Sequence, residues 1–446
     1  MWHDELFTLW ISRLHLAGLV QALRHDSGPP LFYILEIPFV RLAETVHWDL
    51  VIRVLPYVAS LLLLLVIRAS LPKEEGGSWT LALAACSPLL TVYAAEARAY
   101  GLLALFSLLL FLLLFRDRPG RLRFWGAAAV AAAALWTHYL AIFFVAACAC
   151  LLVARRRFAS AGALLAGMLA FVPWISALAG QPAAATAWMY EPLSSSTIAF
   201  LSTLGGAGRL PIPLGGPLPA TLTALGAGVG IGLLIAVSLS ARRDPECADA
   251  IALVLLTMIP ILAVSLLRPV AFPGRSEMVV LPLWLWAAGR AASRLRAARW
   301  LVAAAVAVAL ASSATALLAP KMESSPTQVV SAVARSSRPG DTVIASGAFY
   351  LPARLARDRR QLAASLAAFP AEQADHPGWI TLRSPLDSDF ENFARILAQT
   401  PAGRRIFLLL PPVARNARLE RLLIERGSLR LAADAPDALV YVCTAR

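Results

Sequence analysis

The sequence predicts an α-helical polytopic membrane protein with about ten transmembrane helices, followed by a small C-terminal α/β domain. Of its 446 residues, 59% are hydrophobic and 15% are charged, and the mean hydropathy is +0.68. Average soluble chains carry roughly 45–50% apolar and about 25% charged residues. Several stretches of about 17 to 22 residues contain almost no charge, the length that crosses a hydrocarbon core of roughly 30 Å. A soluble globular protein is therefore excluded.

Ten apolar stretches are expected to cross the membrane. They are residues 50–69, 78–95, 98–115, 123–138, 140–154, 158–178, 218–240, 249–267, 277–291 and 299–318. Alternate connections differ in charge, since one set carries fifteen Lys or Arg residues and the other four. Basic residues favour the cytoplasmic side, so the first set is predicted to be cytoplasmic. Both termini then lie on the extracytoplasmic side.

The net charge of +13 does not indicate a nucleic-acid partner. Nucleic-acid binding needs basic residues gathered on one solvated face or arm. Here they fall in short clusters between apolar stretches, where they set the orientation of the helices in the bilayer. The five cysteines show no spacing that suggests a disulfide framework.

Residues 1–49 are predicted to form an extracytoplasmic loop that contains an interfacial helix. The stretch 31–46, "LFYILEIPFVRLAETV", is apolar but short and carries Glu36, Arg41 and Glu44. A helix that lies in the membrane interface fits this pattern better than a crossing helix. An eleventh span there would invert the charge asymmetry of every later connection. The transmembrane domain is expected over residues 50–319.

Residues 320–446 are predicted to form a separate extracytoplasmic α/β domain. Short aliphatic or β-branched runs suggest strands, and helical patterns separate them. The strand-like runs are "DTVIAS", "GWITL", "RIFLLLP" and "ALVYVC", and the helical ones include "QVVSAVARSS" and "RLERLLIERG". The tail has no glycine-rich phosphate loop, so a nucleotide site is not expected.

Four clusters of ionisable and aromatic residues lie at the predicted extracytoplasmic surface. They are Asp4 and Glu5 with the following "HDSGPPLFY", then "YAAEARAYG", then "THY", and then "FPGR" before the ninth stretch. Taken singly, each has an ordinary explanation as a solvated charge or an interfacial anchor. Ionisable groups beside apolar spans cost about 2.5–3.5 kcal/mol on insertion scales and tend to mark functional sites. Their convergence on one side predicts an active site there.

The order of these motifs resembles the GT-C glycosyltransferases that use polyprenyl-phosphate sugars. It is most similar to the bacterial group that includes lipopolysaccharide-core galacturonosyltransferases and lipid A aminoarabinose transferases, with protein O-mannosyltransferases as more distant relatives. The match covers roughly residues 2–290 in motif order, and "PPLFY" with "EARAY" is its most specific part. The resemblance implies a multi-pass protein of the bacterial inner membrane. It would move a sugar, with inversion, to a lipid, glycan or protein acceptor of the cell envelope.

The resemblance also implies roles for the reacting groups. Asp4 matches the catalytic carboxylate and would deprotonate the acceptor hydroxyl. Glu5 would orient the acceptor, or hold Arg98 or a metal, so a divalent cation is left open as a cofactor. Arg98, Arg275 and His138 would neutralise the donor phosphate, because the guanidinium fork matches phosphate oxygens.

Five further residues are assigned to substrate binding on the same grounds. Tyr33 and Tyr100 would line the sugar or polyprenyl groove, and Tyr139 lies beside His138. Asp26 would contact the sugar, while Glu96 is expected to pair with Arg98. The predicted partners are thus a polyprenyl-phosphate-linked sugar donor, its acceptor and membrane lipids.

Three alternatives stay open from the sequence. A transporter or flippase of lipid-linked sugars would also place charges near apolar helices, although such sites usually lie at the bilayer midplane between internal repeats. A ligase-like transferase would use a large outer loop, and the loop at 179–217 carries only Arg209. An inactive relative is the third. Relatives have a transmembrane helix before the acidic pair, so we expect either that the start of this sequence is incomplete or that this span has been lost. A separate departure is Ser276, which follows Arg275 where relatives often have Tyr.

Overall fold

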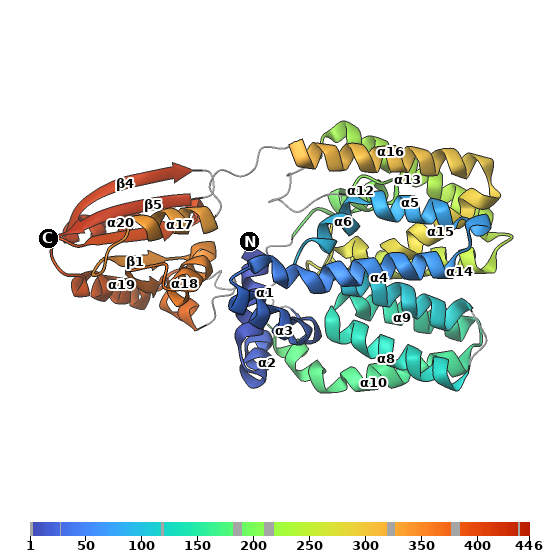
Figure 1. Ribbon diagram of the computed structural model, residues 1–446, viewed down its shortest axis with the longest axis horizontal. Helices are drawn as coiled ribbons and strands as arrows, with labels where there is room; N and C mark the ends of the chain where they lie inside the picture. The colour runs from blue at the N-terminus through green and yellow to red at the C-terminus, as the bar shows by residue number, and fades with distance from the viewer. Residues whose placement is uncertain are drawn as a thin grey trace. The chain divides into compact units, whose positions relative to one another are not determined.

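The computed structural model describes residues 3–26, 28–116, 120–181, 190–208, 218–318, 326–375, 384–435 and 438–446. They form two compact units. One contains residues 1–11 with residues 322–446, and the other contains residues 12–321. Helix α1, His3–Arg13, begins in the first unit and ends in the second (Figure 1).

The larger unit is built from helices. These are α2 (Leu16–Arg24), α3 (Leu31–Val46), α4 (Val54–Ser70), α5 (Gly77–Cys86), α6 (Pro88–Ala94), α7 (Tyr100–Phe111), α8 (Arg121–Thr137), α9 (Leu140–Ala154), α10 (Phe158–Gly180), α12 (Leu193–Leu204), α13 (Ala220–Ala241), α14 (Pro245–Val264), α15 (Leu281–Arg294) and α16 (Arg296–Leu318). Short turns of other helix types lie at η1 (Asp49–Arg53), η2 (Lys73–Glu75), η3 (Leu112–Arg116) and η5 (Ser276–Val279). Each of the ten predicted apolar stretches is helical over most of its length.

In the described part of the chain, five helical segments are long and apolar enough to cross a membrane. They are Asp49–Ser70, Phe158–Gly180, Ala220–Ala241, Pro245–Val264 and Arg296–Thr315. Helices α5 and α6 form a pair bent by 63° that would add a sixth span. Shorter apolar helices cover Tyr100–Arg116, Leu140–Ala154 and Leu193–Leu204. The chain is therefore a multi-pass membrane protein, while crossing by all ten stretches stays a prediction.

The bend between α5 and α6 has a local cause in the sequence. Pro88 occupies the first turn of α6, where its fixed φ suits a helix start and its missing N–H is not needed. The Ser87 hydroxyl caps α6 by accepting from the Leu90 N–H at 3.5 Å. One helix therefore ends and another begins within a single apolar stretch.

Small residues allow the helices of this unit to approach closely. A Cβ added at Gly289 in α15 would come within 2.0 Å of the Thr80 hydroxyl in α5. At Gly167 in α10 it would come within 2.6 Å of the Ala128 carbonyl oxygen in α8. Close contact of this kind is how helices in lipid gain packing energy, because the lipid removes most of the hydrophobic drive.

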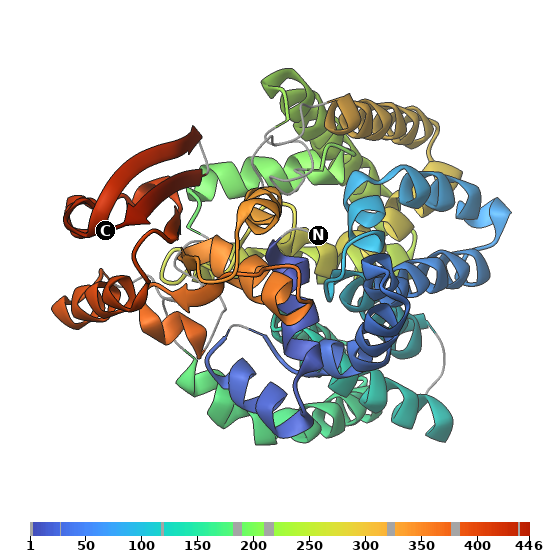
Figure 2. The same cartoon turned by 60° about the vertical axis from the view of Figure 1, so that its left-hand side comes forward.

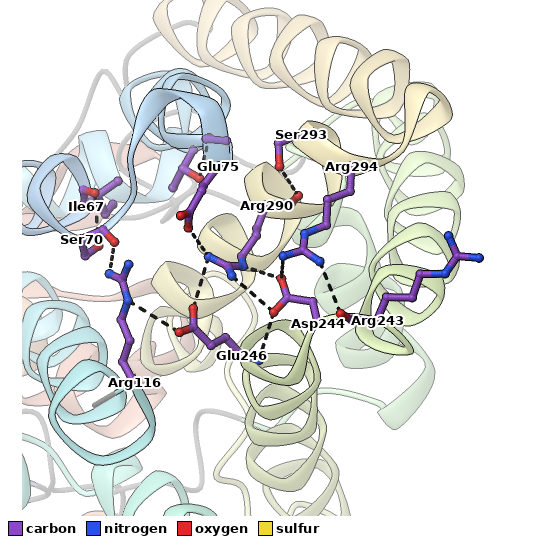
Figure 3. A network of polar contacts seen from close by, with 12 residues as sticks. Ile67, Ser70, Glu75, Arg116, Arg243, Asp244, Glu246, Arg290, Ser293 and Arg294 are labelled. Carbon is purple, nitrogen blue, oxygen red and sulfur yellow. Dashed lines mark hydrogen bonds and ion pairs between the residues drawn. The ribbon is translucent and has the colours of Figure 1, made fainter. Parts of the chain in front are cut away.

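A network of charged residues joins several helices at the end of α15 (Figure 3). The Arg290 guanidinium lies 2.6 Å from a Glu75 oxygen and 3.2 Å from a Glu246 oxygen, and it also pairs with Asp244. Arg294 lies 3.1 Å from the same Asp244 carboxylate. Asp244 and Arg290 are buried. The network thus connects η2 and the first turn of α14 to α15.

Residues 3–46, where the sequence predicts a loop with one helix, form three helices. The His15 imidazole caps α2 by accepting from the Gly18 N–H at 2.9 Å. Pro30 precedes the first residue of α3, which runs through all of the predicted helical stretch. The position of α3 in the membrane interface stays a prediction.

The C-terminal residues form a five-stranded mixed sheet. Its strands are β1 (Thr342–Ala345), β2 (Ser365–Ala368), β3 (Arg405–Leu410), β4 (Gly427–Ala435) and β5 (Ala438–Ala445), in the order β2-β1-β3-β5-β4. β1 pairs in parallel with β2 and β3, whereas β5 pairs antiparallel with β3 and β4. β4 and β5 lie side by side as long red arrows (Figures 1 and 2).

Helices cover both faces of this sheet. They are α17 (Pro326–Ser336), α18 (Tyr350–Asp358), α19 (Asp387–Gln399) and α20 (Ala417–Arg426). α17 and α18 contribute to the core on the side of Val343, and α19 and α20 to the core on the side of Ile344. Successive strand residues point to opposite faces, which accounts for the two cores. The predicted α/β fold of this region is confirmed, and "GWITL" lies outside the described residues.

Candidate functional site

The connection between α6 and α7 brings the "YAAEARAYG" residues into a tight turn. The Arg98 N–H donates to the Glu96 carbonyl oxygen at 2.7 Å. Glu96 is buried, and Tyr93 and Tyr100, on either side of the turn, are buried too. A carboxylate and a guanidinium are thus held at a helix junction, where the sequence predicts a site.

The "FPGR" turn is attached to this junction through Gly274. The Tyr93 hydroxyl donates to the Gly274 carbonyl oxygen at 2.8 Å, and the Gly274 N–H donates to Glu277 at 2.9 Å. Gly274 has a φ of +84°, in the left-handed region that favours glycine. The Ser276 hydroxyl closes the turn by accepting from the Phe272 N–H at 2.6 Å. These contacts fix the backbone that carries Arg275.

The positive charges of Arg275 and Arg98 both interact with the imidazole of His138. Arg275 is 6% exposed, and its guanidinium carbon lies 4.8 Å from the centre of the Phe272 ring. Burial and the positive charges of Arg98 and Arg275 lower the pKa of His138 to about 3. The Leu140 N–H donates to His138 Nδ1 at 3.1 Å. Because Nδ1 accepts, the neutral ring carries its proton on Nε2.

Three aromatic rings connect the two parts of this site. The ring centres of Tyr93 and Tyr100 lie 4.5 Å apart, and those of Tyr100 and His138 lie 5.0 Å apart. The charges of Arg275, Glu96 and Glu277 all act on Tyr93. We call Tyr93, Glu96, Arg98, Tyr100, His138 and Arg275 the arginine cluster. Two guanidinium groups beside a neutral imidazole N–H suit an anion with several oxygens.

A second cluster adjoins the first, because Tyr139 follows His138 in the chain. The Trp174 indole N–H donates to the Tyr139 hydroxyl oxygen at 2.9 Å, and the Gln181 amide donates to the Leu23 carbonyl oxygen at 2.8 Å. Burial raises the pKa of Tyr139 to about 12, and the charge of Asp26 acts on the same phenol. Asp26 and Tyr139 are thus close to each other.

The remaining predicted residues lie on the first and third helices. Asp4 and Glu5 are buried in the first turns of α1, and the Asp4 carbonyl oxygen accepts from the Thr8 hydroxyl at 3.1 Å. They belong to a different compact unit from Arg98, so their convergence with the arginine cluster stays a prediction. Tyr33 is buried on α3, and its carbonyl oxygen accepts from the Ser12 hydroxyl at 3.0 Å.

Tyr93 and Glu277 contribute to the site but were not predicted from the sequence as site residues. Tyr93 is the first residue of the "YAAEARAYG" motif, and Glu277 lies two residues after Arg275. Their positions in or beside the predicted motifs could have indicated them. Among the described residues, no three His, Cys, Asp or Glu side chains are grouped so that they could hold a metal ion.

Two solved structures resemble the whole chain. One is ArnT from Cupriavidus metallidurans in the apo state, with a TM-score of 0.60 and 12% sequence identity, over 94% of this chain and 88% of that chain. The other is ArnT from the same organism bound to undecaprenyl phosphate, with a TM-score of 0.59 and 12% identity, over 93% and 88%. This chain has the fold of ArnT.

The ArnT fold confirms, at the level of architecture, the resemblance to the GT-C glycosyltransferases that the motif order indicates. At 12% identity the likeness to ArnT concerns the fold alone. No protein-family model matches the sequence, and no curated protein matches it either. Assignment of chemistry to this ArnT-like chain therefore depends on its own residues.

Proposed function

We propose that this chain is an inverting membrane glycosyltransferase. It moves a sugar from a polyprenyl-phosphate donor to a lipid, glycan or protein acceptor of the cell envelope. The reaction takes place on the extracytoplasmic side of the bacterial inner membrane. The observation that carries the proposal is the arginine cluster, in which Arg98 and Arg275 act on one neutral imidazole. The ArnT fold adds support, since a structure with that fold is bound to undecaprenyl phosphate.

The donor phosphate is the anion that fits the arginine cluster. When the bond between the anomeric carbon and the phosphate oxygen breaks, its electron pair stays on the phosphate. The guanidinium groups of Arg98 and Arg275 stabilise that charge, and the His138 Nε2–H donates to one phosphate oxygen. A polyprenyl phosphate leaves readily under these conditions, so no carboxylic acid is needed to protonate it. This differs from glycoside hydrolysis, which uses two carboxyl groups.

Asp4 is proposed as the general base and Glu5 as the residue that orients the acceptor. As the acceptor oxygen attacks the anomeric carbon, its proton passes to the Asp4 carboxylate, and the sugar inverts. Asp26 and Tyr139 would contact the sugar hydroxyls, and Tyr33 and Tyr100 would line the groove. Glu96 would pair with Arg98 through its charge.

Transfer of labelled sugar from polyprenyl-phosphate donors to envelope lipids, in membranes that contain the full chain, tests the proposal. Arg98→Gln and Arg275→Gln are each expected to lower the rate about 100- to 1,000-fold, the typical cost of one donor to a developing anion. Arg268→Gln is the matched control, because Arg268 is exposed on the same predicted side. It should transfer at the rate of the unmodified chain.

Asp4→Asn separates the base from the phosphate site. We expect it to lower transfer about 100- to 10,000-fold while leaving affinity for undecaprenyl phosphate unchanged. Full transfer by this variant would rule out Asp4 as the base. Full transfer by both arginine variants would remove the phosphate site, and movement of a lipid-linked sugar without transfer would favour a flippase.

A further inference from the structure

A cavity of about 390 Å³ lies between α8, α10 and the η3 turn, well away from the arginine cluster. Its walls include Arg121, Arg123 and Phe124 at the beginning of α8, whereas His138 follows the last residue of that helix. Seventeen helical residues separate the two ends, or about 25 Å at 1.5 Å per residue. The cavity volume falls within the range of small-molecule sites, about 300–1,000 Å³.

One side of this cavity is strongly positive. Arg121 and Arg123 line it from the first turn of α8, and Ser160 lines it from the first turn of α10. The positive ends of two helix dipoles therefore add to two guanidinium groups. Arg157 attaches the start of α10 to η3 by donating to the Leu114 and Phe115 carbonyl oxygens at 2.8 and 3.1 Å.

The other side of the cavity is apolar, and the helices that form it also carry exposed apolar side chains. Leu113, Phe124 and Ala163 line the cavity. At the starts of α8 and α10, Leu122 is 88% exposed, Trp125 60% and Phe158 65%. Large apolar side chains this exposed face lipid in a membrane protein, and Trp is enriched at the membrane interface. The cavity thus combines two guanidinium groups with apolar walls.

We propose that this cavity binds one anionic phospholipid from the cytoplasmic leaflet. The lipid phosphate lies between Arg121, Arg123 and the first turn of α10, and an acyl chain packs on Leu113 and Phe124. Basic pockets between transmembrane helices on the cytoplasmic side are suited to such headgroups. The cytoplasmic placement follows from the basic residues that flank α8 and α10. Lipid binding at this cavity does not depend on sugar transfer.

Native mass spectrometry of the purified full chain tests this site. The protein is mixed with equal amounts of phosphatidylglycerol and phosphatidylcholine that have identical acyl chains, and the bound lipids are counted. We expect one phosphatidylglycerol to be retained preferentially. Arg121→Gln with Arg123→Gln should lower that preference about 30-fold, because each basic group near an anionic surface contributes about fivefold.

Two further variants separate charge from shape. Ser160→Leu fills the cavity without changing its charge and should lower retention of both lipids. Arg242→Gln removes an exposed basic residue of the same predicted side that does not line the cavity, and should retain the unmodified preference. Equal retention of the two lipids by the unmodified chain would overturn the proposal. So would an unchanged preference in the double arginine variant.

Discussion

Replacement of Glu36 by glutamine is expected to stabilise the protein, and increasingly so as the pH rises above 5. Glu36 is fully buried on α3, and no described group forms a hydrogen bond with either of its carboxyl oxygens. Burial raises its pKa from 4.5 to about 9. The folded chain therefore holds this carboxyl in its neutral form at neutral pH, since an unpaired buried charge would cost far more.

The magnitude follows from the two pKa values of Glu36. Between pH 4.5 and about pH 9 the carboxyl is ionised in the unfolded chain and protonated in the folded chain, so unfolding releases a proton. Raising the pH through this window lowers the free energy of unfolding by about 1.4 kcal/mol per pH unit. At pH 7 the accumulated cost is about 3 kcal/mol, and glutamine, which does not titrate, removes it.

Thermal unfolding in detergent from pH 5 to pH 8 measures this effect. The melting temperature of Glu36→Gln should exceed that of the unmodified chain by a margin that grows by several degrees across the range. Glu44→Gln on the same helix is the control, because Glu44 is partly exposed and paired with Arg13 at 2.5 Å. A surface pair contributes about 0–1 kcal/mol. A Glu36→Gln margin that does not change with pH would refute the reasoning.

Three other predictions concern packing and charge. Arg290→Ala should lower the free energy of unfolding by about 3 kcal/mol, because the buried Asp244 carboxylate loses its buried partner and keeps the partly exposed Arg294. Arg294→Ala should cost less, since Arg294 is 39% exposed; equal melting temperatures would contradict this. Gly289→Ala should lower the free energy of unfolding by about 1–3 kcal/mol, because the added Cβ would lie 2.0 Å from the Thr80 hydroxyl oxygen in α5. Gly228→Ala is the control, because a Cβ added there has no neighbouring atom within 4 Å, and it should not destabilise the protein. Equal losses of stability in the two glycine variants would show that α5 and α15 are not closely packed. Because the pKa of His138 is low, the unfolded chain takes up a proton below pH 6.5 that the folded chain does not. The His138→Gln variant should therefore gain stability relative to the unmodified chain as the pH falls from 6.5 to 5. A stability difference that stays constant over this range would argue against a buried neutral imidazole.

The sequence could predict which residues of the arginine cluster come together. Glu96, Arg98, Tyr100, His138 and Arg275 lie next to the ends of apolar stretches, and the alternation of basic connections assigns those ends to one side. Their common charge effects on His138 and Tyr93 agree with that grouping. The predicted membrane topology was sufficient to group these residues, because helices that cross a membrane restrict where their ends can lie.

The contacts that fix these residues could not be predicted in the same way. The hydrogen bond from Tyr93 to Gly274 joins positions 181 residues apart, and nothing local in the sequence indicates such a pair. The place of Asp4 relative to this cluster is equally a matter of long-range arrangement. Hydropathy reports which segments are apolar, whereas side-chain partners depend on how the helices pack.

Two strands of the C-terminal sheet were missed for a related reason. β2 and β4 are the edge strands, so each has only one neighbouring strand. Ser365 and Leu431 are exposed at these edges, and neither strand contains a continuous aliphatic run. The three central strands were predicted correctly, because burial on both faces requires such runs.

The charged network around Arg290 bears on how the protein is made. Helices enter the membrane in chain order, and the partners of Arg290 lie at Glu75, Asp244 and Glu246, all of which precede it. An arginine that reaches apolar surroundings alone is costly, but here its carboxylates are already in place when α15 arrives. A chain that stopped before α15 would leave Glu75 and Asp244 without the partner that Arg290 supplies, whereas Glu246 would keep Arg116. The late helix thus neutralises charges that earlier parts of the chain carry.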